Sequence, residues 1–382
     1  MERKIVHLDM DSFFVSVEQL RDSRLKGIPL AVGGTGDRGI ITTCSYEARV
    51  FGVRSGMSMK LAKKLCPQLL IIRGDFERYS MYSRMITEII ADNTPKYEKA
   101  SIDEFYVDMS GMDTHFGCLK FSTELRHYIM NQTGLPVSFG LASNKLISKV
   151  ATNDAKPNGQ LEIGYGLEKG FLAPKPVEKL PMVGDQTAYA LRKKGIETIK
   201  LLSEVPLPYM ESMFGKNGIE LSRRANGIDE SPIIQYSEQK SISTENTFEQ
   251  DTIDMQFLHS ELVRMTEKIS FDLRSKGLLT GCITVKLRYT NFDTVTKQQT
   301  IAYTNSDHML LPIAKELFAK LYDRRLLIRL LGIRFTHLVP GTYQINLFED
   351  SHKIISLNNA MDNIKMRYGA GKITRAVTLL NR

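Results

Sequence analysis

Apolar residues in the first 165 positions follow the periods of a sheet covered by helices. Residues 3–9 form a short apolar run that predicts a buried strand, and FFVSVEQL after it predicts the start of a helix. The pattern then predicts a helix, a strand pair, a helix, a strand and a helix, at residues 76–93, 97–109, 116–131, 137–142 and 144–153. This β–α–β–β–α–β order is that of a ferredoxin-like split βαβ unit.

The pattern changes on either side of that unit. Short strands are predicted at residues 29–32 and 39–44, and residues 46–67 are predicted to be mostly helical up to Pro67. From about residue 165, helices separated by a Gly turn continue to about residue 227.

Residues 232–240 show little periodicity, which predicts a linker. Residues 241–340 then alternate strand patterns (CITVKLRYT, LLGIRFTHLV) with two long helical patterns near 255–276 and 309–323. The tail, 341–382, holds a helix-like stretch, MDNIKMRYG.

Composition limits the class of protein. The chain has 382 residues, with 51 basic and 43 acidic side chains, a net charge of +8 that weakly favours a polyanionic partner. Residues 76–164 are nevertheless acidic, which favours a cation-binding site. Four separated cysteines without a C-x-x-C pair fit a reducing cytosol, and no apolar run is long enough to span a membrane.

Two acidic pairs stand where predicted strands end or turn. Asp9 and Asp11 follow the first strand, and Asp103 and Glu104 lie at the turn of the strand pair beside it. Clustered carboxylates with no histidine or cysteine expected nearby favour Mg²⁺ or Mn²⁺ over Zn²⁺, and two such ions can drive phosphoryl transfer. Each pair alone is also compatible with a surface turn, and a nucleotidyl cyclase would use a similar arrangement.

Four strings extend this pattern: HLDMDSFFVSVE, CSYEARVFGVRSGM, ASIDEFYVD and SNKLISKVATNDAKPNG. In their order and spacing, the chain resembles the Y-family of DNA polymerases, in the DinB or polymerase IV branch, from about residue 4 to 340. The resemblance implies an α+β multidomain fold shaped as a right hand, with a ferredoxin-like palm, small fingers, a helix–hairpin–helix thumb and an α/β little finger. These domains would occupy residues 1–10 with 76–164, 11–75, 165–231 and 241–340, followed by the tail 341–382.

The resemblance also implies the catalytic centre. Asp9, Asp103 and Glu104, with the backbone carbonyl of Met10, match the ligands of two Mg²⁺ ions, for which Mn²⁺ can substitute. Glu104 would lie nearest the primer 3′-hydroxyl, and Asp11 matches a position that the family does not use as a ligand.

Further matches concern the nucleotide. Phe14 matches the steric gate that rejects ribonucleotides, whereas its neighbour Phe13 is either a second substrate contact or a core residue of the helix. The family's triphosphate contacts match Tyr46, Arg49 and Lys156. The small residues over the nascent base pair match Thr42 and Thr43. For Arg49, a solvated helix face is the alternative.

The remaining matches concern DNA and a partner protein. KLPMVGDQTAYALRKKGIETI resembles a helix–hairpin–helix that binds DNA phosphates, with Gly184 kept and Met182 in place of the first glycine. Arg329 and Arg334 are expected on one exposed sheet face of the little finger. The segment QINLF resembles a peptide that binds the sliding clamp, through Gln344, Leu347 and Phe348.

The resemblance implies a low-fidelity, translesion DNA-directed DNA polymerase. It would use primer–template DNA and deoxynucleoside triphosphates, without proofreading. We expect a monomer in the bacterial cytosol, at the nucleoid. The alternatives are a nucleotidyl cyclase, which needs neither the gate nor the helix–hairpin–helix, and a non-catalytic DNA-binding relative, which would have lost a carboxylate.

Overall fold

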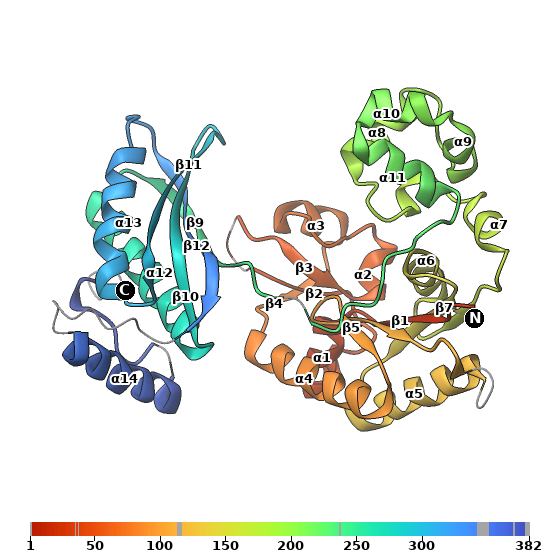
Figure 1. Ribbon diagram of the computed structural model, residues 1–382, viewed down its shortest axis with the longest axis horizontal. Helices are drawn as coiled ribbons and strands as arrows, with labels where there is room; N and C mark the ends of the chain where they lie inside the picture. The colour runs from red at the N-terminus through yellow and green to blue at the C-terminus, as the bar shows by residue number, and fades with distance from the viewer. Residues whose placement is uncertain are drawn as a thin grey trace. The chain divides into compact units, whose positions relative to one another are not determined.

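The computed structural model describes residues 2–34, 36, 38–112, 117–236, 238–341, 351–369 and 371–378. The chain divides into two compact units, Met1–Ser237 and Glu238–Arg382. Each unit is described by itself below, with the helices and strands labelled in Figure 1.

A five-stranded sheet forms the centre of the first unit. Its strands lie in the order β5 (Tyr97–Lys99), β6 (Glu104–Asp108), β1 (Ile5–Met10), β7 (Val137–Ala142) and β8 (Gln160–Glu162). Strands β5, β6, β1 and β7 pair antiparallel in the order of a ferredoxin-like unit, while β8 runs parallel to β7 at the edge. The predicted ferredoxin-like order is therefore confirmed.

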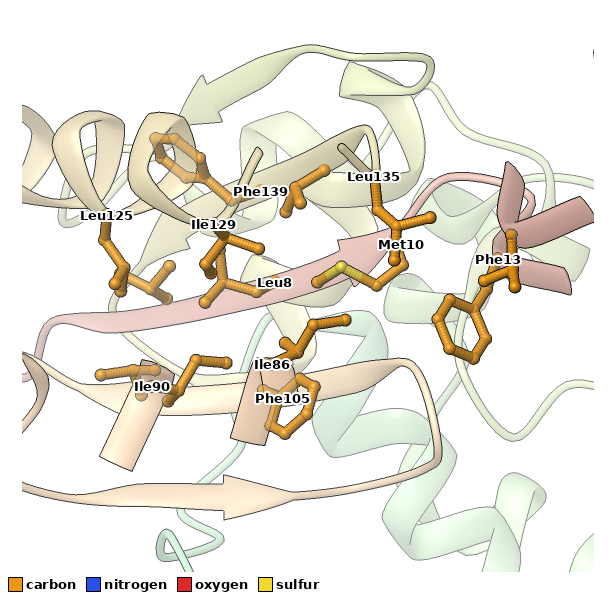
Figure 2. Packing of buried hydrophobic residues seen from close by; sticks show 14 of the residues in the cluster. Leu8, Met10, Phe13, Ile86, Ile90, Phe105, Leu125, Ile129, Leu135 and Phe139 are labelled. Carbon is orange, nitrogen blue, oxygen red and sulfur yellow. The ribbon is translucent and has the colours of Figure 1, made fainter. Parts of the chain in front are cut away.

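Helices cover both faces of this sheet. Leu8 and Met10 point from β1 toward α4 (Phe76–Asn93) and α5 (Cys118–Thr133), where they share a buried core with Ile86 and Ile129 (Figure 2). The alternate residues of β1 face α6 (Lys145–Ala155), since His7 bonds to Thr152 of that helix. Because side chains of a strand alternate, the face toward α6 also receives Asp9.

A smaller sheet follows β1 and α1 (Phe13–Arg21). Its strands lie in the order β3 (Ile41–Cys44), β2 (Leu30–Gly33) and β4 (Leu70–Ile72). Residues 46–67 form two short helices, α2 (Tyr46–Val50) and α3 (Met59–Leu65), rather than the mostly helical segment that was predicted. Gly52 and Gly56 explain the difference, because both adopt a left-handed backbone, with φ of 85° and 86°.

Helices are the main elements in the rest of the first unit, as predicted from about residue 165 to about residue 227. They are α7 (Glu168–Leu172), α8 (Asp185–Arg192), α9 (Ile199–Glu204), α10 (Leu207–Phe214) and α11 (Lys216–Ala225), with a 3-10 turn at Val177–Lys179. Leu180, Leu191, Leu202 and Met210 are buried in their shared core.

The second unit is a four-stranded antiparallel sheet with helices on one face. Its order is β11 (Thr294–Thr304), β10 (Leu278–Tyr289), β12 (Ile328–Pro340) and β9 (Ser241–Thr252). Ile283 and Ile333 of the central strands share a core with helices α12 (Met255–Ser275) and α13 (Asp307–Leu321). The two edge strands carry many exposed polar residues, so their sequences gave no clear apolar alternation.

The tail helix belongs to the second unit. Helix α14 runs from Ser351 to Tyr368, and its Asp362 accepts two hydrogen bonds from the buried Arg274 of α12, at 2.6 and 2.8 Å. Arg375 beyond it bonds to Glu267 and Asp307 at 2.9 and 3.0 Å. Gln344, Leu347 and Phe348, the predicted clamp contacts, lie outside the described residues.

No helix in the described part of the chain is both long enough and apolar enough to cross a membrane.

Candidate active site

Two neighbouring strands bring the predicted metal ligands together. Asp9 is paired directly with Glu104 across β1 and β6, and the amide of Met10 donates to the carbonyl of Asp103 at 3.1 Å. The turn before β6 is fixed by Ser101, whose hydroxyl donates to the Asp103 carboxylate at 2.6 Å and accepts from the Glu104 amide at 3.0 Å. The three carboxylates thus lie at one end of the sheet, as their spacing predicted.

Two lysines neutralise this cluster. Lys156 lies 2.5 Å from the Asp9 carboxylate, and Lys149 donates to both oxygens of Glu104 at 2.8 and 2.7 Å. Lys149 and Thr152 lie on one side of α6, and Lys156 caps its C-terminal end. The sequence motif identified Lys156 but not Lys149, whose role depends on the packing of α6 over β1.

Asp9 is the most buried of the three carboxylates, with only 5% of its surface exposed. Burial raises the pKa of Asp9 to about 7, and the neighbouring Glu104 and Asp103 add to the rise, while Lys156 opposes it. A divalent cation would relieve the same repulsion more strongly than one lysine does, because it carries twice the charge.

The donor set fits a hard divalent cation. Carboxylate oxygens of Asp9 and Glu104, two of the predicted ligands, lie within 4.8 Å of each other and of a nitrogen of His7. Lys156 and Lys149 contact the carboxylates of Asp9 and Glu104, so a cation bound to either carboxylate would compete with an ammonium group.

His7 is a residue that the sequence analysis missed. It is fully buried two positions before Asp9, on the same face of β1, and its Nδ1 lies 2.9 Å from the hydroxyl of Thr152. Burial, with Lys149 and Lys156 nearby, holds the pKa of His7 well below its usual value, so the ring is neutral. The strand alternation alone would have placed it beside Asp9.

The two phenylalanines at the start of α1 lie in different surroundings. Phe14 is half-buried and stacks on Tyr79, with ring centroids 4.3 Å apart. Phe13 is only 2% exposed and belongs to the core below the sheet. Its burial favours the core interpretation of Phe13 over a contact with substrate.

The predicted triphosphate contacts converge on the turn after β1. The Tyr46 hydroxyl donates to Asp11 at 3.1 Å, and Arg49 donates to the Ser12 hydroxyl at 3.1 Å. The guanidinium of Arg49 also lies 4.5 Å from the centre of the Tyr46 ring, so it packs on α2 instead of extending into solvent. Together with Lys156 on Asp9, the predicted phosphate contacts therefore surround the short segment from Asp9 to Ser12.

Thr42 and Thr43 are consecutive in β3, with Thr42 exposed and Thr43 half-buried. Neighbouring residues of a strand point to opposite faces, so at most one of the two side chains faces any one surface.

In the predicted helix–hairpin–helix, the residue with a left-handed backbone is Met182, not a glycine. Met182 adopts φ of 77°, a left-handed conformation that glycine tolerates best, and is 58% exposed. Gly184, in contrast, has φ of −86° and caps α8. The hairpin conformation is therefore kept with a methionine where glycine would be unstrained.

In the second unit, Arg334 lies exposed on the sheet face opposite the helices. The cross-strand pairs of Arg334 are Thr284 of β10 and Ser243 of β9. Arg329 and Arg334 are five residues apart, and on a regular strand such residues point to opposite faces. The register of β12 shifts at Arg329, however, where a bulge interrupts the alternation. Arg329 packs over the ring of Phe292 at 4.6 Å.

Comparisons with known proteins show which family the chain belongs to. The model of the impB/mucB/samB family matches residues 8–153, and that of the family's C-terminal domain matches residues 239–347. A DNA polymerase IV of Dehalococcoides mccartyi is 35% identical over 97% of this chain and 96% of its own length. That of Lactococcus lactis subsp. cremoris is 36% identical over 87% of this chain and 93% of its own.

A solved Y-family DNA polymerase chimera of Dbh and Dpo4 has the same fold. Its TM-score is 0.77 at 23% identity, covering 88% of this chain and all of the chimera. The relatives named DNA polymerase IV, together with this fold, show that the chain is a DNA-directed DNA polymerase. The chain belongs to the Y-family of these enzymes, in the DNA polymerase IV branch.

Proposed function

We propose that this polymerase performs low-fidelity translesion synthesis by two-metal phosphoryl transfer, without proofreading. The observation that carries the proposal is the cluster of Asp9, Asp103 and Glu104 at adjacent strand ends, faced by Lys149 and Lys156. Asp9 and Glu104 also lie, with His7, in the one group of three possible metal-ligating side chains found among the described residues.

Asp9, the carbonyl of Met10, Asp103 and Glu104 would hold two Mg²⁺ ions, with Mn²⁺ able to substitute. Those ions would favour ionisation of the primer 3′-hydroxyl and offset charge on the leaving pyrophosphate. Glu104 is nearest the primer terminus in this assignment.

The nucleotide is positioned by residues around the same turn. Tyr46, Arg49 and Lys156 exchange their present partners for phosphate oxygens, to which Arg49 can bond in two places at once. Phe14, supported by the stacked ring of Tyr79, lies under the sugar and leaves no room for a 2′-hydroxyl. The small β3 side chain that faces the nascent base pair, Thr42 or Thr43, leaves space for a damaged base.

We assign the palm to residues 1–10 and 76–164, the fingers to 11–75, the thumb to 165–231 and the little finger to 241–340. Backbone amides near Gly184, together with Arg329 and Arg334, would contact the DNA backbone. We further propose a monomer, working on chromosomal DNA in the bacterial cytosol. It would bind the sliding clamp through the tail, 341–382, by means of Gln344, Leu347 and Phe348.

Primer extension tests this proposal. Wild type and Glu104→Ala extend a primer on a clean template and on one with a minor-groove guanine adduct, with Mg²⁺ and deoxynucleotides. We expect the wild-type enzyme to pass the adduct and the variant to extend neither template. Extension that stops at the adduct would reject translesion synthesis while leaving the polymerase activity in place.

A further inference from the structure

Asp11 is a buried carboxylate that the metal-binding assignment does not use. Only 1% of its surface is exposed, although it lies two residues from Asp9. Its backbone is anchored in the palm, because its amide donates to the carbonyl of Pro136 at 2.9 Å. Its carbonyl accepts a hydrogen bond of 2.6 Å from the Ser16 hydroxyl.

Three donors from separate elements converge on the Asp11 carboxylate. The hydroxyl of Tyr46, on α2, donates to Oδ1 at 3.1 Å. The hydroxyl of Ser138, on β7, and the amide of Asn158 both donate to Oδ2, at 2.8 and 2.7 Å. Burying a carboxylate is costly unless its oxygens accept hydrogen bonds, and here both do.

The hydrogen bond from Asn158 connects Asp11 to Lys156, another proposed triphosphate contact. Asn158 follows Lys156 by two positions, and its carbonyl and side-chain oxygens accept bonds of 2.7 and 2.6 Å from Arg126. The turn that carries Lys156 is therefore fixed between Arg126 and Asp11. Through Tyr46 and this turn, one carboxylate holds two of the proposed triphosphate contacts, from different parts of the chain.

We propose that Asp11 is a positioning residue for nucleotide binding, which sets Tyr46 and the turn after Lys156 at the separation that a triphosphate needs. Asp11 itself touches neither metal nor nucleotide. This inference rests on the proposed role of Tyr46 as a triphosphate contact, so the test separates the two.

Three single variants and one double variant test the proposal by single-nucleotide incorporation. Asp11→Ala removes the shared acceptor, and we expect the KM for the correct deoxynucleotide to rise about tenfold, with a smaller change in kcat. Asp11→Asn can keep an oxygen toward Ser138 and Asn158 while its amide donates to the Tyr46 oxygen, so we expect a KM within about threefold of wild type. Tyr46→Phe alone should raise KM, and Asp11→Ala with Tyr46→Phe should raise it by less than the product of the two single effects.

Ser16→Ala is the matched control. It removes a buried hydrogen bond to the backbone of Asp11 but leaves the carboxylate and its three donors in place. We expect the control to lower the melting temperature without changing KM.

Each contrary outcome has its own meaning. If Tyr46→Phe leaves KM unchanged, the proposed triphosphate contact fails, and the inference about Asp11 fails with it. If Tyr46→Phe raises KM while Asp11→Ala alters only the melting temperature, Asp11 is merely structural and the inference alone is overturned. A KM for Asp11→Asn as high as that of Asp11→Ala would also overturn the inference, because the amide of Asn can still hold Tyr46 and the turn after Lys156 in position.

Discussion

At the scale of single residues, two carboxylates of the acidic cluster form ion pairs with lysines of another element, α6 and the residue that follows it. Lys149 and Lys156 of the α6 region pair with Glu104 and Asp9, whose own strands bring the carboxylates together. These ion pairs offset the repulsion between the buried like charges, and a cation would compete with them.

Replacing Lys149 by methionine should strengthen metal binding. Lys149→Met removes the competing ammonium from Glu104 while keeping the length of the side chain, and we expect the dissociation constant for Mn²⁺ to fall about tenfold. Electron paramagnetic resonance of free Mn²⁺ measures it in the DNA-free protein. Lys145→Met is the control, because Lys145 makes the same two-oxygen contact with Glu98, at 2.7 and 2.8 Å. Equal effects of the two variants would contradict the account.

Phe14→Ala should admit ribonucleotides. Removing the ring opens the space under C2′, and we expect discrimination against ribonucleotides to fall about a hundredfold, equivalent to about 2.7 kcal/mol. The ratio of kcat/KM for matched deoxy- and ribonucleotides measures the change. Phe13→Leu, a change in the core, should lower the melting temperature and leave this ratio alone. An equal loss of discrimination in Phe13→Leu would restore Phe13 as a substrate contact.

The sequence predicted the carboxylates because strand ends and acidic pairs are local features. It missed the roles of Lys149, His7 and Asp11, since each depends on which face of β1 lies against α6, or on hydrogen bonds between segments more than a hundred residues apart. Local periodicity does not determine such contacts.

At the scale of elements, the ferredoxin-like order and the boundaries of β7 were predictable, because long apolar patterns and turns agreed there. The segment 46–67 was not, since Gly52 and Gly56 end the helical course at positions whose φ the sequence does not show. The edge strands β9 and β11 were hidden by their polar composition. Met182 is the converse case, a left-handed residue that is not glycine.

Met182→Gly should stabilise the helical part of the first unit. Glycine accepts the φ of 77° without steric cost, and we expect a gain of about 1 kcal/mol in the free energy of unfolding. The matched control is Gly184→Ala, because φ there is −86° and an added Cβ would have no heavy atom within 4 Å. Urea denaturation should show a change within about 0.5 kcal/mol for the control. A loss of stability in Met182→Gly would show that its side chain, rather than its backbone, matters.

At the scale of the whole molecule, the two units divide the proposed work. The first contains the acidic cluster and the nucleotide contacts, and the second offers a sheet whose helix-free face carries Arg334, Lys286 and Thr284. Phosphate contacts on such a face supply affinity without reading sequence. The tail helix adds to the second unit through the buried pair of Arg274 and Asp362.

Arg334→Ala should weaken DNA binding in a salt-dependent way. The slope of log K against log salt is negative, and losing one phosphate contact makes it shallower by about 1. Fluorescence anisotropy of a labelled primer–template across a salt series measures the slope. Arg264→Ala should leave it unchanged, because Arg264 lies on α12, on the other side of the sheet, beside Glu261. An unchanged slope for Arg334→Ala would remove Arg334 from the DNA contacts.

The central claim, that the cluster at the ends of β1 and β6 performs the chemistry, is tested most directly by single-turnover incorporation. Glu104→Gln removes one charge from the cluster, whereas Glu98→Gln removes one from the neighbouring strand β5, where Glu98 pairs with Lys145. With saturating DNA, deoxynucleotide and Mg²⁺, we predict that Glu104→Gln slows incorporation at least about a thousandfold, equivalent to about 4 kcal/mol, and that Glu98→Gln stays near wild type. Equal rates for the two variants would contradict the account.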